Sequence, residues 1–561
     1  MVDLKRWADR LLRRSGARPS SGSEPPAPRP TAGPVDPSSD PTAARLAALT
    51  EEGRHAEALA LVESELARLE QEDDPSPVLL RQLQMSAGRA GAISLHLRAL
   101  RRRLEIFPDD PSLLRQLRTQ EGRWRETDPS WLPTIEPAVL GSLPTRPRHS
   151  EPTGRVLHLV KIGMPQRQSG YSMRTMYTLT GELRAGLSPV AVTALDFPHT
   201  VGVLDAPPVD EVGGVRYVHL LRDEIPSSEP WDAYLDAYAT ALAPVVAAED
   251  PDLIHVHSGN RGYEAALVAL AVGRALDLPV VYEVRGFFES LWSSDTAWAE
   301  QAEVYRRRHA QEARCMREAA AVVTLSESMK DDIVGRGIPA EHVHVVPNGV
   351  DPTVFVPRER DDELTARLGL EDRFVFGYVS NLDHYREGQE LLVDAAVELR
   401  RRGVPATALI VGDGNRRELL EAHAREVGAG DAVHFTGKVP HTEVGDYYAQ
   451  LDVFVIPRID ERAARLVTPL KPYEAMALSV PLVVSDLPAL REITGDGERG
   501  ETFTTGDARS LADVLQRLHE DPERRARHAA TAREWVVTER DWARNGERYG
   551  AIYSSVLTPS S

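Results

Sequence analysis

Short runs of apolar, mostly β-branched residues alternate with longer amphipathic segments from about residue 155 onward. This alternation predicts buried parallel strands, each followed by a helix. The runs form two series on either side of VHVVPNGVDPTVF: RVLHLVKIG, PVAVTALD, DLIHVHS, PVVYEVRG and AAVVTLS before it, and FVFGYVSN, TALIVGDG, VHFTGKV, VFVIPR and PLVVSD after it. We therefore expect an α/β chain with two doubly wound sheets. Residues just beyond the carboxyl ends of these strands are the candidates for function, because open parallel sheets bind ligands there.

The segment before these sheets has a different pattern. Residues 42–128 are rich in Ala, Leu, Arg and Glu at helical spacing, which predicts an α-helical domain. The dipeptide Gly-Arg recurs at Gly53, Gly88 and Gly122, 35 and 34 residues apart, and this is the spacing of tetratricopeptide-like repeats. Stacked helix pairs of that kind leave a groove for a protein partner. Most aromatic positions of that repeat are absent here, so a plain helical bundle is the alternative.

Two further segments flank the helical domain. Residues 1–41 are dominated by Pro, Ser, Gly and Ala after a basic start, and we expect them to be disordered because they cannot bury enough apolar surface. Residues 1–18 hold six basic and two acidic side chains, with Trp7 on the apolar face of a helical pattern. They form either a helix that touches anionic lipid or a solvated chain end. The proline-rich residues 129–152 indicate a linker.

Composition and charge narrow the classes of function. The 561 residues include 66 Lys+Arg and 85 Asp+Glu, a formal net charge of −19, which argues against a general nucleic-acid binder. The longest apolar run, residues 265–273, is far shorter than the ~18 residues that span a bilayer. Cys315 is the single cysteine, so no intrachain disulfide forms. The start has no apolar core of a secretory signal, and we expect a reducing, cytoplasmic location with any membrane contact peripheral and at the inner face.

The stretch from Leu466 to Asp486, LVTPLKPYEAMALSVPLVVSD, carries the strongest motif of the chain. Together with PNGVD, LIVGDG, FTGKVP and YEVRGF, it resembles the retaining glycosyltransferases of family 4. Within that family the chain is similar to the branch that reads S-G-Y-x-x-R-T and T-P-L-K-x-x-E-A-M-A, which here are residues 169–175 and 468–477. The resemblance extends over residues 155–557.

This resemblance implies the GT-B fold, in which two Rossmann-like domains face a cleft. The acceptor domain is then expected at residues 153–355 and the nucleotide-sugar donor domain at residues 356–535. The resemblance also implies that a helix within residues 536–561 crosses back onto the first domain.

The donor site is expected where a helix opens at Leu470 and Lys471, because a helix N-terminus and an ammonium group both attract a diphosphate. By the resemblance, Glu474 accepts hydrogen bonds from the ribose hydroxyls; otherwise it is an acid stabilised by the helix dipole. The resemblance assigns to the donor site the further residues Gly170, Asn381, Gly437, Lys438 and Thr468.

The chain departs from the family pattern in this region. Leu466 stands where the family has the first of two glutamates, and Asn381 and Glu387 stand where the family has the basic residues that hold the diphosphate. We expect Arg386 and Lys471 to supply the positive charge in their place.

Four positions are assigned to the acceptor side and one to catalysis on the first sheet. Tyr171 and Arg174 belong to the branch motif. Glu283 and Arg285 end one strand, and they either pair with each other or bind the acceptor. His257 ends the preceding strand, and the resemblance gives it a catalytic contact with the donor sugar or the acceptor hydroxyl. A structural histidine is the alternative.

The resemblance implies retaining transfer of a hexose from a nucleoside diphosphate sugar to a hydroxyl of a sugar or glycolipid acceptor, in polysaccharide or glycoconjugate synthesis. The departing diphosphate, stabilised by Lys471 and Arg386, then helps to deprotonate the acceptor. We expect no cofactor and no metal, because the D-x-D pattern at Asp250 and Asp252 precedes a strand and so lies at the wrong end of the sheet. Two alternatives stay open: a sugar-nucleotide epimerase on the same fold, and a scaffold with a degenerate transferase body.

We predict that deletion of residues 1–18 lowers binding to vesicles that contain anionic lipid, because the deletion removes a basic segment with an interfacial tryptophan. Co-sedimentation with vesicles of anionic and of neutral lipid measures the effect. Equal binding of the full and the shortened chain would exclude this segment as a membrane contact.

Overall fold

The computed structural model describes residues 36–144, 151–226, 228–293, 295–440 and 442–558. These residues fall into two compact units, one reaching to Leu117 without residues 91–93, and one from Arg118 onward together with residues 91–93. The segment expected to touch lipid, residues 1–18, lies outside the described residues. Within the described ranges no helix is long and apolar enough to cross a membrane.

The first unit consists of helices whose starts recur along the chain. Its elements are η1 (Pro37–Ser39), α2 (Pro41–Glu51), α3 (His55–Leu69), α4 (Pro77–Arg89), α5 (Ile93–Ile106) and the first part of α6 (Pro111–Glu126). Helices α2, α4 and α6 each begin with proline, which suits a first helical turn, and their starts lie 36 and 34 residues apart. Gly53, Gly88 and Gly122 stand 12, 11 and 11 residues after these starts. The predicted helical region is confirmed, but its Gly-Arg pairs differ in setting: Gly53 lies in the turn after α2 with a left-handed backbone, whereas Gly88 and Gly122 lie within α4 and α6.

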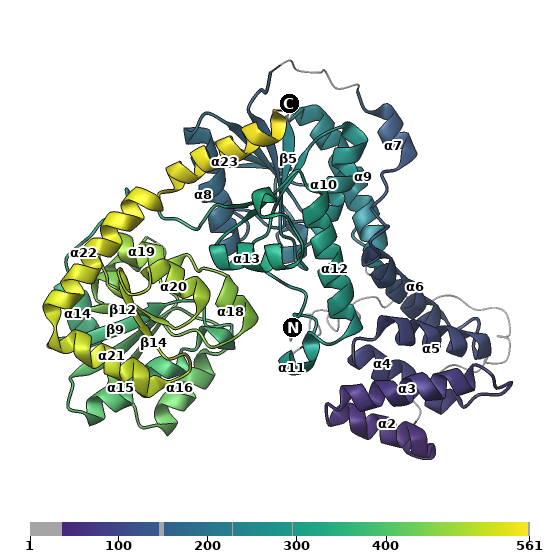
Figure 1. Ribbon diagram of the computed structural model, residues 1–561, viewed down its shortest axis with the longest axis horizontal. Helices are drawn as coiled ribbons and strands as arrows, with labels where there is room; N and C mark the ends of the chain where they lie inside the picture. Colours follow the sequence, from purple (N-terminus) through teal and green to yellow (C-terminus); the bar gives the residue numbers. More distant parts are fainter. Residues whose placement is uncertain (1–35, 145–150, 227, 294, 441, 559–561) are drawn as a thin grey trace, which may run out of the picture. The chain divides into compact units, whose positions relative to one another are not determined.

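The second unit holds two sheets (Figure 1). The first has the strand order β3-β4-β2-β1-β5-β6-β7-β8 and is parallel except for the pair β3–β4. The second has the order β11-β10-β9-β12-β13-β14 and is parallel throughout. The two predicted doubly wound sheets are therefore confirmed. The strands are β1 (Arg155–Val160), β2 (Ser188–Thr193), β3 (Val209–Val212), β4 (Val215–Val218), β5 (Leu253–His257), β6 (Val280–Glu283), β7 (Ala321–Thr324), β8 (Val343–Val345), β9 (Phe374–Val379), β10 (Ala406–Val411), β11 (Val433–Gly437), β12 (Val453–Ile456), β13 (Leu482–Ser485) and β14 (Gly500–Phe503).

Helices follow the strands in both sheets. Strands such as β5, β6 and β12 are buried along their whole length, as expected for parallel strands covered on both faces. Short 3-10 turns are η2 (His199–Val201), η3 (Ala340–His342), η4 (Tyr385–Glu387) and η5 (Gly430–Ala432). The α-helices of this unit, besides the end of α6, are α7 (Pro137–Ser142), α8 (Gly170–Arg184), α9 (Trp231–Glu249), α10 (Glu264–Leu276), α11 (Thr296–Ala299), α12 (Glu303–Glu318), α13 (Glu327–Gly335), α14 (Asp362–Leu368), α15 (Glu390–Arg401), α16 (Arg417–Glu426), α17 (Val444–Ala449), α18 (Arg462–Leu466), α19 (Lys471–Ala477), α20 (Pro488–Thr494), α21 (Ala508–Glu520), α22 (Pro522–Glu539) and α23 (Trp542–Leu557).

The chain returns from the second sheet to the first through α22 and α23, drawn in yellow in Figure 1. Helix α23 packs against α8, and two glycines allow the backbones to approach: a Cβ on Gly546 would collide with the carbonyl oxygen of Gly181. On its buried face α23 carries Tyr549 and Tyr553, which join a core cluster with residues of β1, β5, β6 and β7.

Helix α12 carries a buried acid, Glu312. Glu312 is 1% exposed; its Oε1 accepts a hydrogen bond from the hydroxyl of Tyr282, and its Oε2 has no hydrogen-bond partner among the described residues. Burial, together with the nearby charge of Glu289, raises the pKa of Glu312 to about 8. This group therefore makes the stability of the fold depend on pH.

We predict that Glu312→Gln flattens the fall of stability that occurs as pH rises from 4.5 to about 8. Between the ordinary pKa of 4.5 and about 8 the folded chain keeps a proton that the unfolded chain releases, so stability falls as pH rises through this window. Relative to the native chain, the free energy of unfolding of the variant should rise by up to about 1.4 kcal/mol for each pH unit in the window. Thermal unfolding across this range measures the gain, with the exposed Glu300→Gln as control. Parallel pH curves for the native chain and Glu312→Gln would contradict the prediction.

Candidate functional site

A cleft of about 570 Å³ opens between the two sheets of the second unit. On the side of the first sheet its lining includes Lys161, Tyr171, Arg174, Arg285 and Phe288, which we call the N-terminal wall. On the side of the second sheet the lining includes Asn381, Arg386, Arg458, Leu470, Lys471 and Glu474, which we call the C-terminal wall. Six lining residues are basic, and the two acidic ones are Glu387 and Glu474. The cleft therefore suits an anionic ligand.

The strand order explains why the cleft lies here. In each sheet the direction of strand addition reverses once, between β1 and β5 in the first sheet and between β9 and β12 in the second. Such switch points create crevices at the carboxyl ends of strands. Lys161 directly follows β1, and Asn381 and Arg458 stand two residues after β9 and β12.

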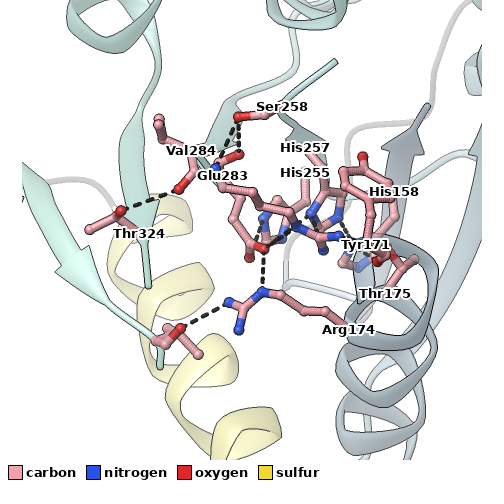
Figure 2. A network of polar contacts seen from close by, with 12 residues as sticks. His158, Tyr171, Arg174, Thr175, His255, His257, Ser258, Glu283, Val284 and Thr324 are labelled. Atoms are coloured by element: carbon pink, nitrogen blue, oxygen red, sulfur yellow. Dashed lines mark hydrogen bonds and ion pairs between the residues drawn. The ribbon is translucent and has the colours of Figure 1, made fainter. Parts of the chain in front are cut away.

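A buried carboxylate organises the N-terminal wall (Figure 2). Glu283, at the end of β6, accepts hydrogen bonds from Nε of Arg174 at 3.1 Å, from Nε of Arg285 at 2.6 Å and from the hydroxyl of Tyr549 in α23. Burial disfavours the charge, but Arg174 and then Arg285 hold the pKa of Glu283 well below its ordinary value. Arg174 also donates to Oδ1 of Asn348 at 2.9 Å. The ion pair expected between Glu283 and Arg285 is present, and it is shared with Arg174.

A chain of hydrogen bonds runs from Arg285 into the core. Nη2 of Arg285 donates to Nδ1 of His257 at 2.7 Å, because a guanidinium can only donate. The proton of a neutral His257 then lies on Nε2 and points to Nδ1 of His158 at 3.0 Å, and Nε2 of His158 donates to Glu182 at 2.8 Å. Burial, and then the charge of Arg285, lowers the pKa of His257 well below its ordinary value, consistent with the neutral ring.

The placement of His257 differs from the expected catalytic contact. Its side chain is fully buried, both ring nitrogens have protein partners, and it is not among the residues that line the cleft. His257 therefore lies behind Arg285 and positions its guanidinium group. Sequence reasoning missed His158, which lies on β1 and pairs in register with His255 on the neighbouring strand β5.

The three histidines also form the one group among the described residues whose composition would suit a metal ion, with ligand atoms within 4.8 Å of one another. Two of these atoms, Nδ1 of His158 and Nε2 of His257, share a hydrogen bond, and the rings of His255 and His257 stack at 4.4 Å. Stacked rings direct their lone pairs side by side and not toward a common point. The hydrogen-bond chain from Arg285 to Glu182 accounts for His158 and His257, and Nδ1 of His255 is hydrogen-bonded to the hydroxyl of Tyr553.

The C-terminal wall contains the start of α19. Nζ of Lys471 lies 3.0 Å from Oε2 of Glu474, and the hydroxyl of Tyr448 donates to the same oxygen at 3.0 Å. The amide of Asn348 donates to the backbone carbonyl of Thr468 at 2.8 Å and so links the segment before α19 to the first sheet. A charged pair with a fixed carboxylate thus faces the cleft at the place that the motif predicts.

Glu387 and Arg458 form the second ion pair of this wall. Nε and Nη2 of Arg458 both lie 3.2 Å from the carboxylate of Glu387, which also accepts from the hydroxyl of Tyr378. Nη1 of Arg458 donates to the carbonyl of Val467 at 2.9 Å. Although burial opposes ionisation, Arg458 lowers the pKa of Glu387. Arg458, which follows the neighbouring strand β12, thus neutralises Glu387. Arg386 and Lys471 are the cations of this wall that are not held in such a two-atom contact between a guanidinium and a carboxylate.

The cleft brings most of the predicted site residues together. Those that line it are Gly170, Tyr171, Arg174, Arg285, Asn381, Arg386, Thr468, Leu470, Lys471 and Glu474. Glu283, like His257, lies beneath the N-terminal wall. Gly437 and Lys438 are not among the lining residues; Gly437 has a left-handed backbone, and Lys438 is exposed. Sequence reasoning missed Lys161 and Arg458, although each follows a strand that the pattern predicted.

Comparisons with known proteins agree with this geometry. The family model "Glycosyl transferases group 1" matches residues 360–535, and "Glycosyltransferase Family 4" matches residues 174–354. The alpha-D-kanosaminyltransferase of Streptomyces kanamyceticus is 28% identical over 316 residues, 54% of this chain and 77% of the relative. A GDP-mannose-dependent alpha-(1-6)-phosphatidylinositol monomannoside mannosyltransferase of Mycolicibacterium smegmatis is 34% identical over 223 residues, 38% of this chain and 57% of the relative.

Two solved structures have the same fold. Sucrose-phosphate synthase from Thermosynechococcus elongatus has a TM-score of 0.59 and 20% identity, covering 72% of this chain and 99% of that chain. HepE from Anabaena, in complex with UDP-glucose, has a TM-score of 0.56 and 18% identity, also covering 72% and 99%.

We predict that Tyr549→Phe costs about 1–3 kcal/mol of unfolding free energy, because it removes a donor from the buried carboxylate of Glu283. Chemical denaturation measures the loss. Tyr217→Phe is the matched control, since the buried hydroxyl of Tyr217 has no partner among the described residues and its removal should cost little. Equal losses in the two variants would show that the contact with Glu283 adds nothing.

Proposed function

Because the chain belongs to the group 1 glycosyltransferases with the GT-B fold, we propose that it transfers a hexose, with retention, from a nucleoside diphosphate sugar to a hydroxyl of a sugar or glycolipid. The product then belongs to a polysaccharide or glycoconjugate, and the reaction needs no metal cofactor. The observation that carries this proposal is the cleft between the two sheets, in which Lys471 and Glu474 of the donor motif face a second wall rich in cations.

The C-terminal wall suits the donor. Lys471 and Arg386 offer positive charge to the diphosphate, and Glu474 offers a carboxylate to the ribose hydroxyls. Tyr448 holds that carboxylate in place without the donor. The solved structures of HepE with UDP and with UDP-glucose support a nucleotide sugar as the donor of this fold.

The arrangement of acids supports front-face transfer. Among the described lining residues the carboxylates are Glu387 and Glu474. Arg458 and Tyr378 engage Glu387, and Glu474 serves the ribose. Neither is then free to act as a nucleophile. The departing diphosphate, stabilised by Lys471 and Arg386, takes the proton of the acceptor hydroxyl on the same face.

The relatives that the comparisons name are transferases, which supports transfer over epimerisation and over a purely scaffolding function. For the first unit we propose a tetratricopeptide-like repeat that binds a protein partner. The recurrence of helix starts at Pro41, Pro77 and Pro111, 36 and 34 residues apart, supports this assignment.

We predict that Lys471→Ala and Glu474→Ala each lower kcat/KM for the donor at least tenfold, because each removes a charge-assisted contact with the nucleotide sugar. Transfer and donor hydrolysis are measured with a panel of UDP-, GDP- and ADP-sugars. Lys330→Ala is the control: it removes the same charge at a position on α13 outside the cleft lining, and it should keep native activity.

Two results would contradict the proposed function. No turnover and no nucleotide binding with any donor of the panel would exclude the transferase activity. Native kinetics in both Lys471→Ala and Glu474→Ala would show that the donor binds elsewhere.

A further inference from the structure

The N-terminal wall carries more positive charge than its protein partners balance. Lys161, Arg174 and Arg285 line the cleft on this side, and none of the lining residues of the first sheet is acidic. Glu283 lies behind the wall and bonds both guanidinium groups. One carboxylate is thus shared between two arginines, and the lysine stands apart from it.

Lys161 has no ion pair within the described part of the chain, although its side chain is largely enclosed. Its Nζ donates to the carbonyl oxygen of Gly259 at 3.3 Å and lies 4.7 Å and 5.2 Å from the ring centres of Tyr171 and Phe288. The other charged groups that act on it are Glu264 and Arg285. The carboxylate of Glu264 accepts from the backbone N–H groups of Asn260 and Arg261 and is not within ion-pair distance of Lys161.

In this setting an ammonium group recovers only part of the hydration energy that it loses on leaving water. Its contacts with the two aromatic faces offset only part of the cost of enclosing a charge without a counterion. Burial lowers the pKa of Lys161, because the charged form is destabilised at this position. A bound anion would stabilise the charged form.

Lys161 is also the cation of this wall whose N–H groups are not all bonded to protein acceptors. The guanidinium of Arg285 is engaged by Glu283, by the carbonyl oxygen of Tyr171, by the hydroxyl of Thr175 and by His257. Arg174 is engaged by Glu283, Asn348, Val346 and Tyr549. Lys161 has one protein acceptor for three N–H groups.

We propose that the acceptor carries an anionic group, a phosphate or a carboxylate, and that Lys161 of the N-terminal wall binds it. This inference rests on the proposed function, in which the donor occupies the C-terminal wall with Lys471 and Arg386. Because Lys161 follows β1 of the opposite sheet, its charge is available to the second substrate. The guanidinium of Arg285 lies 4.5 Å from the centre of the same Tyr171 ring and adds long-range attraction to the bound anion.

The test compares matched sugars on the full chain, with and without UDP, GDP or ADP. Glucose, mannose and galactose are each offered as the neutral sugar, as the 6-phosphate and as the uronate, and calorimetry gives the dissociation constants. In the native chain we expect at least one anionic form to bind about tenfold tighter than its neutral parent. Lys161→Met should abolish that preference, and Lys161→Arg should keep it. Lys330→Met, which removes a lysine of α13 outside the cleft lining, should leave it unchanged.

The outcomes separate the sources of the anion and the two proposals. Preference for the phosphates alone assigns a phosphorylated acceptor, and preference for the uronates alone assigns a uronic acid; either supports the inference. Equal binding of charged and neutral sugars, or no binding of any of them, overturns it. It is also overturned if Lys161→Met weakens nucleoside diphosphate binding tenfold while the preference for anionic sugars persists, since Lys161 then serves the donor. Nucleotide binding and donor turnover are read separately, so failure of the proposed function is distinguishable from failure of this inference.

Discussion

The contact on which the cleft depends is the one that Glu283 makes with Arg174, Arg285 and Tyr549. It joins the end of β6 to α8 and to α23, three elements that no local sequence signal brings together. Removal of one partner from a buried ion pair costs about 3–5 kcal/mol, because the remaining charge stays buried and uncompensated. The orientation of the N-terminal wall and the docking of α23 are therefore one energetic unit.

The same device recurs on the opposite side of the cleft. Glu387 holds Arg458 and accepts from Tyr378, and Glu474 contacts Lys471 and accepts from Tyr448. In each case a carboxylate orients a cation, and a tyrosine hydroxyl fixes the carboxylate. A tyrosine suits this position because its ring packs in the core while its hydroxyl satisfies an oxygen that would otherwise lack a partner. The walls are thus set before any ligand binds, which lowers the cost of ordering them on binding.

Much of the fold could be predicted from the sequence, because buried parallel strands are continuous apolar runs and each is followed by a helical period. The motif around Lys471 and Glu474 could be predicted for the same local reason: a turn, a helix start and a strand lie within a few residues of one another. Strand order is not local, and so Lys161 and Arg458 were missed although they follow predicted strands; their importance comes from the switch points between β1 and β5 and between β9 and β12. The resemblance gave His257 a contact with the donor sugar or the acceptor, but its side chain is fully buried, its Nδ1 accepts from the guanidinium of Arg285, and it does not line the cleft.

The placement of α23 also has a consequence for the order of events during synthesis. Arg174 and Tyr549 are 375 residues apart in the chain, yet they meet on one carboxylate. A ribosome therefore releases the whole first sheet and the whole second sheet before the hydroxyl that completes the N-terminal wall exists. Until then Glu283 and the groove that receives α23 are open to water, and the nascent first domain presents an unfilled apolar seam. The N-terminal wall is therefore completed only after α23, which follows both sheets in the chain, has been made.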